Sequence, residues 1–267
     1  MYSKRGRKAQ VTLFVILAIV IVGIVLAVYF LIPKNPRSPV IENFNPGTYI
    51  TDCIKDDIDR YVENLSLQGG YMNPEAYPEQ YYTFLETRIQ YLCYTDDEEN
   101  PCIFQKPQLI QDIESQLTNR LKSKITSCLN SFKANTENKV NLLTICTQSQ
   151  LNQEVHLYLK KIVLNITCPI KIETKSNQRL EFNQFLVEKE SPLYEQATLA
   201  KQIVNEEISG NAINFFADYA SRNQDFLLTL DNRFTSIRLY NITAANLLNS
   251  EGNPLTFLFT VKNPKYI

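Results

Sequence analysis

The stretch VHLYLKKIVLNITCPIKIETKSNQRLEF, residues 155–182, alternates apolar and polar side chains along most of its length. A period of two is typical of β-strands that bury one face and leave the other face wet. A polar turn at 175–178 separates the last two runs of this pattern, and the alternation already begins at Lys139. The stretch therefore predicts an antiparallel meander as the centre of the fold.

Helical periodicity precedes the meander. Residues 51–67 and 107–132 carry apolar side chains at intervals of three and four, which predicts two amphipathic helices. The pair Gly69-Gly70 is expected to end the first of them in a left-handed turn. A further helix is predicted over residues 79–91.

Helix and strand patterns alternate after the meander. Ser191 and Pro192 are a typical helix start, with Ser as the cap, and predict a helix as far as Ile208. A short helix is predicted at 212–219, and strands are predicted at 226–230, 237–242 and 255–261. The order indicates an α+β fold. We expect a helical, cysteine-containing subdomain at 47–136, and at 137–267 an antiparallel sheet with one or two covering helices.

The N-terminal part of the chain has a different composition. Residues 11–32 contain no charge, and as a helix they would span about 33 Å, which matches a bilayer core of about 30 Å. Four basic residues precede this segment and two follow it, which places the basic tail 1–10 in the cytoplasm. Three prolines form a stiff tether within 33–46. The sequence predicts a single-pass membrane protein that contacts lipid through 11–32 and has its C-terminal domain outside the cell.

The six cysteines all follow the apolar segment, and an even number in an exported domain indicates disulfides. Two of them flank eight residues rich in acids, Asn and Pro, so a local bond is expected there. Two others lie at opposite ends of the two long helices, which antiparallel packing would bring together. The last two lie on strands that can be neighbours. The predicted bonds are Cys53–Cys128, Cys93–Cys102 and Cys146–Cys168.

Three N-glycosylation sequons also follow the apolar segment. Their asparagines are Asn64, Asn165 and Asn241, each followed two residues later by Ser or Thr. Such motifs occur on the surface of exported proteins, so their position agrees with the predicted topology. The three asparagines are candidate glycosylation sites.

The stretch KAQVTLF, residues 8–14, resembles the archaeal type IV pilin-like (class III) leader. The resemblance implies cleavage between Ala9 and Gln10, with the apolar helix retained on the mature chain. The domain that follows is similar to uncharacterised exported proteins of small-genome archaea, through Cys53 and the turn QGGY at 68–71. Pilin helices continue beyond the membrane, whereas the prolines of the tether would end this one, so a tethered monomer is the preferred interpretation.

No catalytic residue, cofactor site or metal site is expected. His156 is the only histidine and belongs to a predicted strand, and oxidised cysteines would leave it no thiol partner. The acids at 96–99 do not follow the spacing of a calcium loop. The tyrosines within 71–94 could form a sugar- or peptide-binding face, and core packing explains them equally well. With a net charge of −1, nucleic-acid binding is not expected.

These observations favour a membrane-tethered, disulfide-bonded domain that acts at the cell surface by interaction with a protein or glycan, without catalysis. Two alternatives stay open. One is a pilin-like subunit processed after Ala9. The other is an exported hydrolase that uses paired carboxylates, although the aspartates at 52–59 are explained by their favourable place at a helix start.

Overall fold

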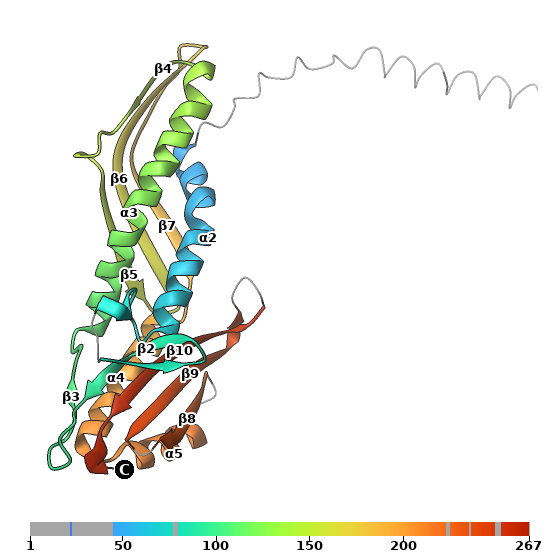
Figure 1. Ribbon diagram of the computed structural model, residues 1–267. Helices are drawn as coiled ribbons and strands as arrows, with labels where there is room; N and C mark the ends of the chain where they lie inside the picture. The colour runs from blue at the N-terminus through green and yellow to red at the C-terminus, as the bar shows by residue number, and fades with distance from the viewer. Residues whose placement is uncertain are drawn as a thin grey trace, which may run out of the picture. The chain divides into compact units, whose positions relative to one another are not determined.

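The computed structural model describes residues 22, 45–76, 80–222, 225–234, 236–248 and 252–266 (Figure 1). The predicted leader cleavage at Ala9–Gln10 and, apart from Val22, the predicted membrane segment 11–32 lie outside these residues. Among the described helices, none is long and apolar enough to cross a membrane. Residues 45–267 form one compact unit, and they have the α+β architecture that the sequence predicts.

Two long helices, α2 (Pro46–Leu67) and α3 (Leu109–Thr136), pack side by side (Figure 1). Helix α2 begins five residues earlier than predicted because the Asn45 side chain caps it, accepting hydrogen bonds from the backbone N–H groups of Gly47 (2.9 Å) and Thr48 (3.3 Å). Each helix buries one apolar stripe at helical spacing. Gly69 and Gly70 end α2 with positive φ, as predicted.

The two helices cover one face of a sheet that we call the long sheet. It contains β4 (Val140–Ile145), β5 (Asn152–Tyr158), β6 (Lys161–Thr174) and β7 (Arg179–Glu190). Strand β6 is central: β7 pairs along one edge, and β4 and β5 pair with the two halves of the other edge. The predicted strands around 162–166 and 170–174 are one strand, whose register against β7 shifts beside Pro169 because proline has no N–H for the ladder.

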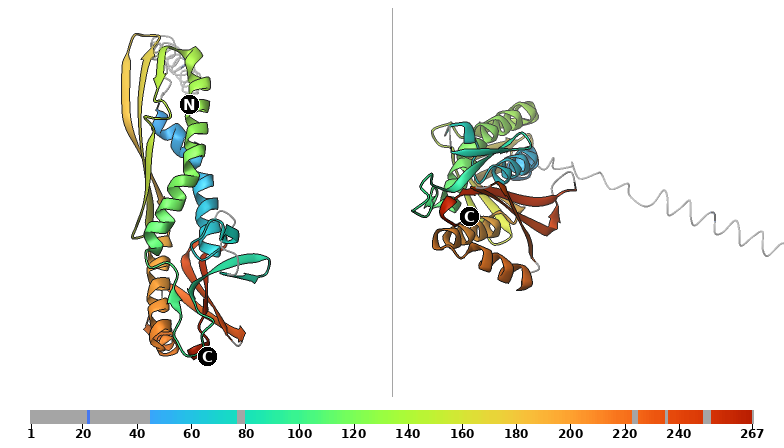
Figure 2. Two further views of the ribbon diagram at one scale, coloured as in Figure 1. Left: turned by 60° about the vertical axis from the view of Figure 1, so that its left-hand side comes forward. Right: turned by 60° about the horizontal axis from the view of Figure 1, so that its bottom comes forward.

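A second sheet, the mixed sheet, collects strands from both ends of the described chain. Its strands are β1 (Tyr81–Phe84), β2 (Thr87–Tyr94), β3 (Ile103–Phe104), β8 (Phe226–Phe234), β9 (Ile237–Leu248) and β10 (Pro254–Lys262). The order is β1-β2-β10-β9-β8, with β3 beside β2, and β2 and β10 are parallel. Helices α4 (Leu193–Ser209) and α5 (Ala212–Arg222) accompany this sheet (Figure 2).

The predicted helix over 79–91 is wrong, because this segment contains most of the β1–β2 hairpin. Its aromatic and β-branched residues favour a strand once a partner strand is present. The two-residue turn Leu85-Glu86 has positive φ at both positions and lacks the Asn or Gly that usually signals such a turn. Because β2 pairs with β10, residues from the predicted 47–136 subdomain share a sheet with residues from 137–267.

Candidate functional site

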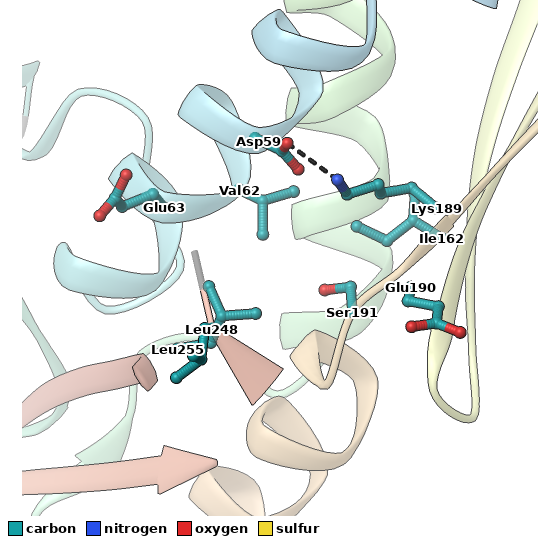
Figure 3. A pocket seen from close by; sticks show the side chains of 9 residues that line it. All are labelled: Asp59, Val62, Glu63, Ile162, Lys189, Glu190, Ser191, Leu248 and Leu255. Carbon is teal, nitrogen blue, oxygen red and sulfur yellow. Dashed lines mark hydrogen bonds and ion pairs between the residues drawn. The ribbon is translucent and has the colours of Figure 1, made fainter. Parts of the chain in front are cut away.

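The first hollow, which we call the junction cavity, lies between α2, the ends of the long-sheet strands β6 and β7, and the mixed sheet (Figure 3). Its volume is about 200 Å³. It is lined by Asp59, Val62, Glu63, Ile162, Lys189, Glu190, Ser191, Leu248 and Leu255. Pockets for drug-sized molecules are usually about 300–1,000 Å³, so this cavity is suited to a single side chain.

Three polar residues of the junction cavity, Asp59, Lys189 and Ser191, have structural partners. Lys189 Nζ lies 2.9 Å from Asp59 Oδ2, and this ion pair joins β7 to α2 (Figure 3). The buried Ser191 hydroxyl accepts a hydrogen bond of 3.3 Å from the backbone N–H of Leu193 at the start of α4. Val62 and Ile162 form an apolar wall and are buried. The arrangement holds three elements together and does not assemble a nucleophile with a base.

A second hollow lies on the outer face of the long sheet, opposite the face that α2 and α3 cover. We call it the outer groove, lined by Leu157, Tyr158, Leu159, Lys161, Val163, Asn165, Leu186, Glu188 and Tyr194. Tyr158, Leu159 and Leu186 are 50%, 70% and 57% exposed, around the buried Val163. The groove volume is about 830 Å³. Figure 2 shows the long sheet with the helix pair on one side only.

Polar groups form the margin of the outer groove. Lys161 Nζ and Glu188 Oε1 are 2.8 Å apart, joining β6 to β7 across the face. His156 lies on the same face of β5, with its ring 6.2 Å from the ring of Tyr158 and its Nε2 3.6 Å from Glu154 Oε2. His156 is a half-exposed strand histidine, as its sequence context predicts. The groove is therefore apolar at its centre and charged at its edge.

The structure contains three disulfides, and they match the three predicted pairs. Cys53–Cys128 joins α2 to α3, Cys93–Cys102 closes the loop after β2, and Cys146–Cys168 joins the end of β4 to β6. The described residues include no free cysteine. The thiol chemistry of this domain is consequently structural.

The three sequon asparagines lie in different surroundings. Asn64 is exposed on α2, but Ser66 of its sequon is buried. Asn241 is half-buried on β9, where its Oδ1 accepts a hydrogen bond of 2.8 Å from the Thr243 hydroxyl. Asn165 lines the outer groove, and its glycosylation, like that of the other two, stays a prediction.

The described tyrosines within 71–94, all but Tyr77, do not share one face. Tyr71 and Tyr91 are buried, and burial, together with nearby tyrosines and Asp96, raises the pKa of Tyr91 to about 12. Tyr94 instead donates a hydrogen bond to Asp96, which also binds Lys262, and the latter bond lowers the pKa of Asp96. Among the described residues, no group of three acidic, cysteine or histidine side chains is placed to hold a metal ion.

A buried network in the mixed sheet was not predicted. Glu207 of α4 has its Oε2 2.6 Å from an Arg238 guanidinium nitrogen, and the Tyr240 hydroxyl donates to its Oε1. All three residues are buried, and burial and the charge of Glu207 raise the pKa of Tyr240. One signal was available in the sequence: Glu207 continues the apolar stripe of α4 through Ala200 and Val204. The network joins α4 to β9 and has no access to a ligand.

The outer groove is the better candidate for a partner site. It is the larger hollow, and its apolar side chains are exposed, whereas the junction cavity is narrow and its ion pair serves the fold. No family model matches the chain, and neither a curated protein nor a solved structure matches it. The geometry of the groove is therefore the basis of the functional proposal.

Proposed function

We propose that this chain is a membrane-anchored extracytoplasmic domain that binds a partner at the cell surface through its outer groove, without catalysis. The observation that carries the proposal is the exposed apolar surface formed by Tyr158, Leu159 and Leu186 in one hollow. Contiguous apolar surface with a polar rim is costly to leave in water and is typical of interaction sites. A partner that covers it would remove this surface from water.

Two features support the extracytoplasmic location. Structural disulfides form and persist in oxidising compartments, and all six cysteines are paired in three bonds. The apolar segment 11–32 supplies the anchor in this proposal. The alternatives of a pilin-like subunit and of a carboxylate-dependent hydrolase gain no support from the groove.

A matched pair of leucines tests the groove. Leu186 (57% exposed) lies in it, and Leu142 (55% exposed) lies on β4 of the same sheet, outside the groove. We would place a photo-crosslinking benzoylphenylalanine at position 186 or 142 of the full chain in its native cells. A specific adduct at position 186 and none at 142 is expected. Equal adducts at both positions, or none at 186, would contradict the proposal.

Lysine labelling tests the location. Lys122 is exposed on α3, outside the groove, and Lys4 belongs to the predicted cytoplasmic tail. A membrane-impermeant amine reagent applied to intact cells should modify Lys122 and leave Lys4 unmodified until the cells are lysed. Protection of both lysines in intact cells would place the domain inside the cell.

A further inference from the structure

The sequon Asn165-Ile166-Thr167 lies on β6 at the outer groove. Successive strand residues point to opposite faces, so Asn165 and Thr167 share the outer face while Ile166 is buried beneath α3 and α2. Asn165 lines the groove, and Thr167 is exposed next to it. The acceptor amide and the hydroxyl of the motif are thus both on the wet side of the sheet.

In each of the other two sequons, the acceptor amide or the Ser/Thr hydroxyl is less accessible to solvent. The buried position of Ser66 withdraws its hydroxyl from solvent, and Thr243 bonds the acceptor side chain of Asn241 directly. The Thr243 hydroxyl also lies 3.2 Å from the Thr256 hydroxyl of the neighbouring strand. Asn165 is therefore the acceptor whose modification the folded domain accommodates best.

The outer groove is also suited to a sugar. A pyranose ring has an apolar C–H face and a rim of hydroxyl groups, and tyrosine rings combine an apolar body with a polar tip. Tyr158 and Tyr194 supply two such rings, and Lys161 and Glu188 supply a donor and an acceptor at the rim. The volume of about 830 Å³ gives room for the first sugars of a chain attached at Asn165.

We infer that Asn165 carries an N-linked glycan whose first sugars lie in the outer groove, so that only chains unmodified at Asn165 leave the groove open to a partner. The closing role rests on the whole proposed function, and the modification rests on its extracytoplasmic location alone. The donor is an oligosaccharide linked through its anomeric carbon to a polyprenyl phosphate or diphosphate. Asn165 Nδ2 forms a bond to that carbon and loses a proton, and the carbon–oxygen bond breaks as the lipid phosphate leaves with the electron pair.

Glycopeptide mass spectrometry tests the modification. The full chain is produced in a host whose export pathway N-glycosylates Asn-X-Ser/Thr, beside a reporter with a known sequon. The expected result is that N165Q removes one glycan mass, whereas N64Q and N241Q do not. An unmodified Asn165 beside a glycosylated reporter, in a chain whose Lys122 is labelled from outside the cell, would overturn the inference and leave the proposed function standing.

Dye binding tests two claims separately: that the glycan closes the groove, and that the groove is an apolar binding site. Anilinonaphthalene sulfonate fluorescence is compared for the glycosylated chain and for N165Q, each with and without L186E or L142E. We expect several-fold higher fluorescence for N165Q, lost on adding L186E and kept on adding L142E. Equal fluorescence for the glycosylated chain and N165Q would overturn closure by the glycan. Fluorescence of N165Q that L186E does not lower would instead contradict the groove as an apolar site.

Discussion

The long sheet and the mixed sheet are each covered by helices on one face, but they place their charges differently. The Lys161–Glu188 pair of the long sheet is about half-exposed, whereas the Arg238–Glu207 pair of the mixed sheet is almost fully buried. A surface ion pair contributes little to stability because water solvates each charge nearly as well as the partner does. A buried charge that loses its partner has no water to replace it. The comparison shows where charge is structural in this fold and where it is available to a partner.

The largest expected effect is loss of the buried charge. Glu207→Ala removes the acceptor that Arg238 and the Tyr240 hydroxyl share and should lower the free energy of unfolding by about 3–5 kcal/mol. The matched change Glu188→Ala should cost less than about 1 kcal/mol because its pair is exposed. Urea unfolding of the two variants provides the measurement. Equal losses would show that the two pairs are not energetically different.

The long sheet and the mixed sheet can also be compared through the disulfides beside them. Cys53–Cys128, which holds the helices over the long sheet, links residues 75 apart, and Cys93–Cys102 of the mixed sheet links residues 9 apart. Because the longer loop restricts the unfolded chain more, we expect double Cys→Ala variants to lose about 4 and about 3 kcal/mol, respectively. Thermal unfolding under non-reducing conditions measures both. The reverse order would indicate that packing around the bonds outweighs loop length.

A smaller effect is expected at the edge of the long sheet. The Glu114 carboxylate of α3 accepts a hydrogen bond of 2.8 Å from Leu157 N–H of β5, and the Thr118 hydroxyl accepts one of 3.0 Å from Val155 N–H. Glu114→Ala should destabilise the domain by about 1–2 kcal/mol because a strand donor loses its acceptor. Faster hydrogen exchange of the Leu157 amide would report the loss. Lys122→Ala on the exposed side of the same helix is the control and should leave that exchange unchanged.

An effect of a different kind appears only in alkali, and it should affect the mixed sheet. Burial raises the pKa of Tyr91 from 10.0 to about 12, so the unfolded chain loses this proton first. The stabilisation from neutral Tyr91 is therefore fully present below pH 10 and is lost as the pH rises toward 12. Unfolding of the wild type and of Tyr91→Phe, followed between these pH values, measures it. A wild type that loses no more stability than the variant would refute the assignment.

Elements with strong local periodicity could be predicted from the sequence. The two long helices and the strands of the long sheet carry their spacing within one segment, and the disulfide between the helices follows from their antiparallel packing. The β1–β2 hairpin could not be predicted in this way. It depends on β10, whose Thr260 pairs with Tyr91 across most of the domain sequence, and no local pattern encodes such a pairing.

The outer groove also depends on tertiary context. Alternation places Leu159 on the buried face with Val155 and Leu157, but β5 ends at Tyr158 and Leu159 is 70% exposed. Leu159 and Lys160 form the turn between β5 and β6, where Lys160 has a φ of 61°, so Leu159 lies beyond the last strand pair, Tyr158 with Lys161. The exposure of Leu186 follows only from the pairing of β7 with β6. The sequence thus identifies the strands, whereas the position of each turn decides which leucines meet water.

The position of β10 has a consequence for the order in which the domain can assemble during synthesis. Strand β10 lies between β2 and β9, and it is synthesised after every other strand of the mixed sheet. Until residues 254–262 emerge, β2 lacks the neighbour that links it to β9, whereas every strand of the long sheet is already available. The long sheet can therefore form while the chain is still being synthesised, and the mixed sheet is completed only when β10 arrives.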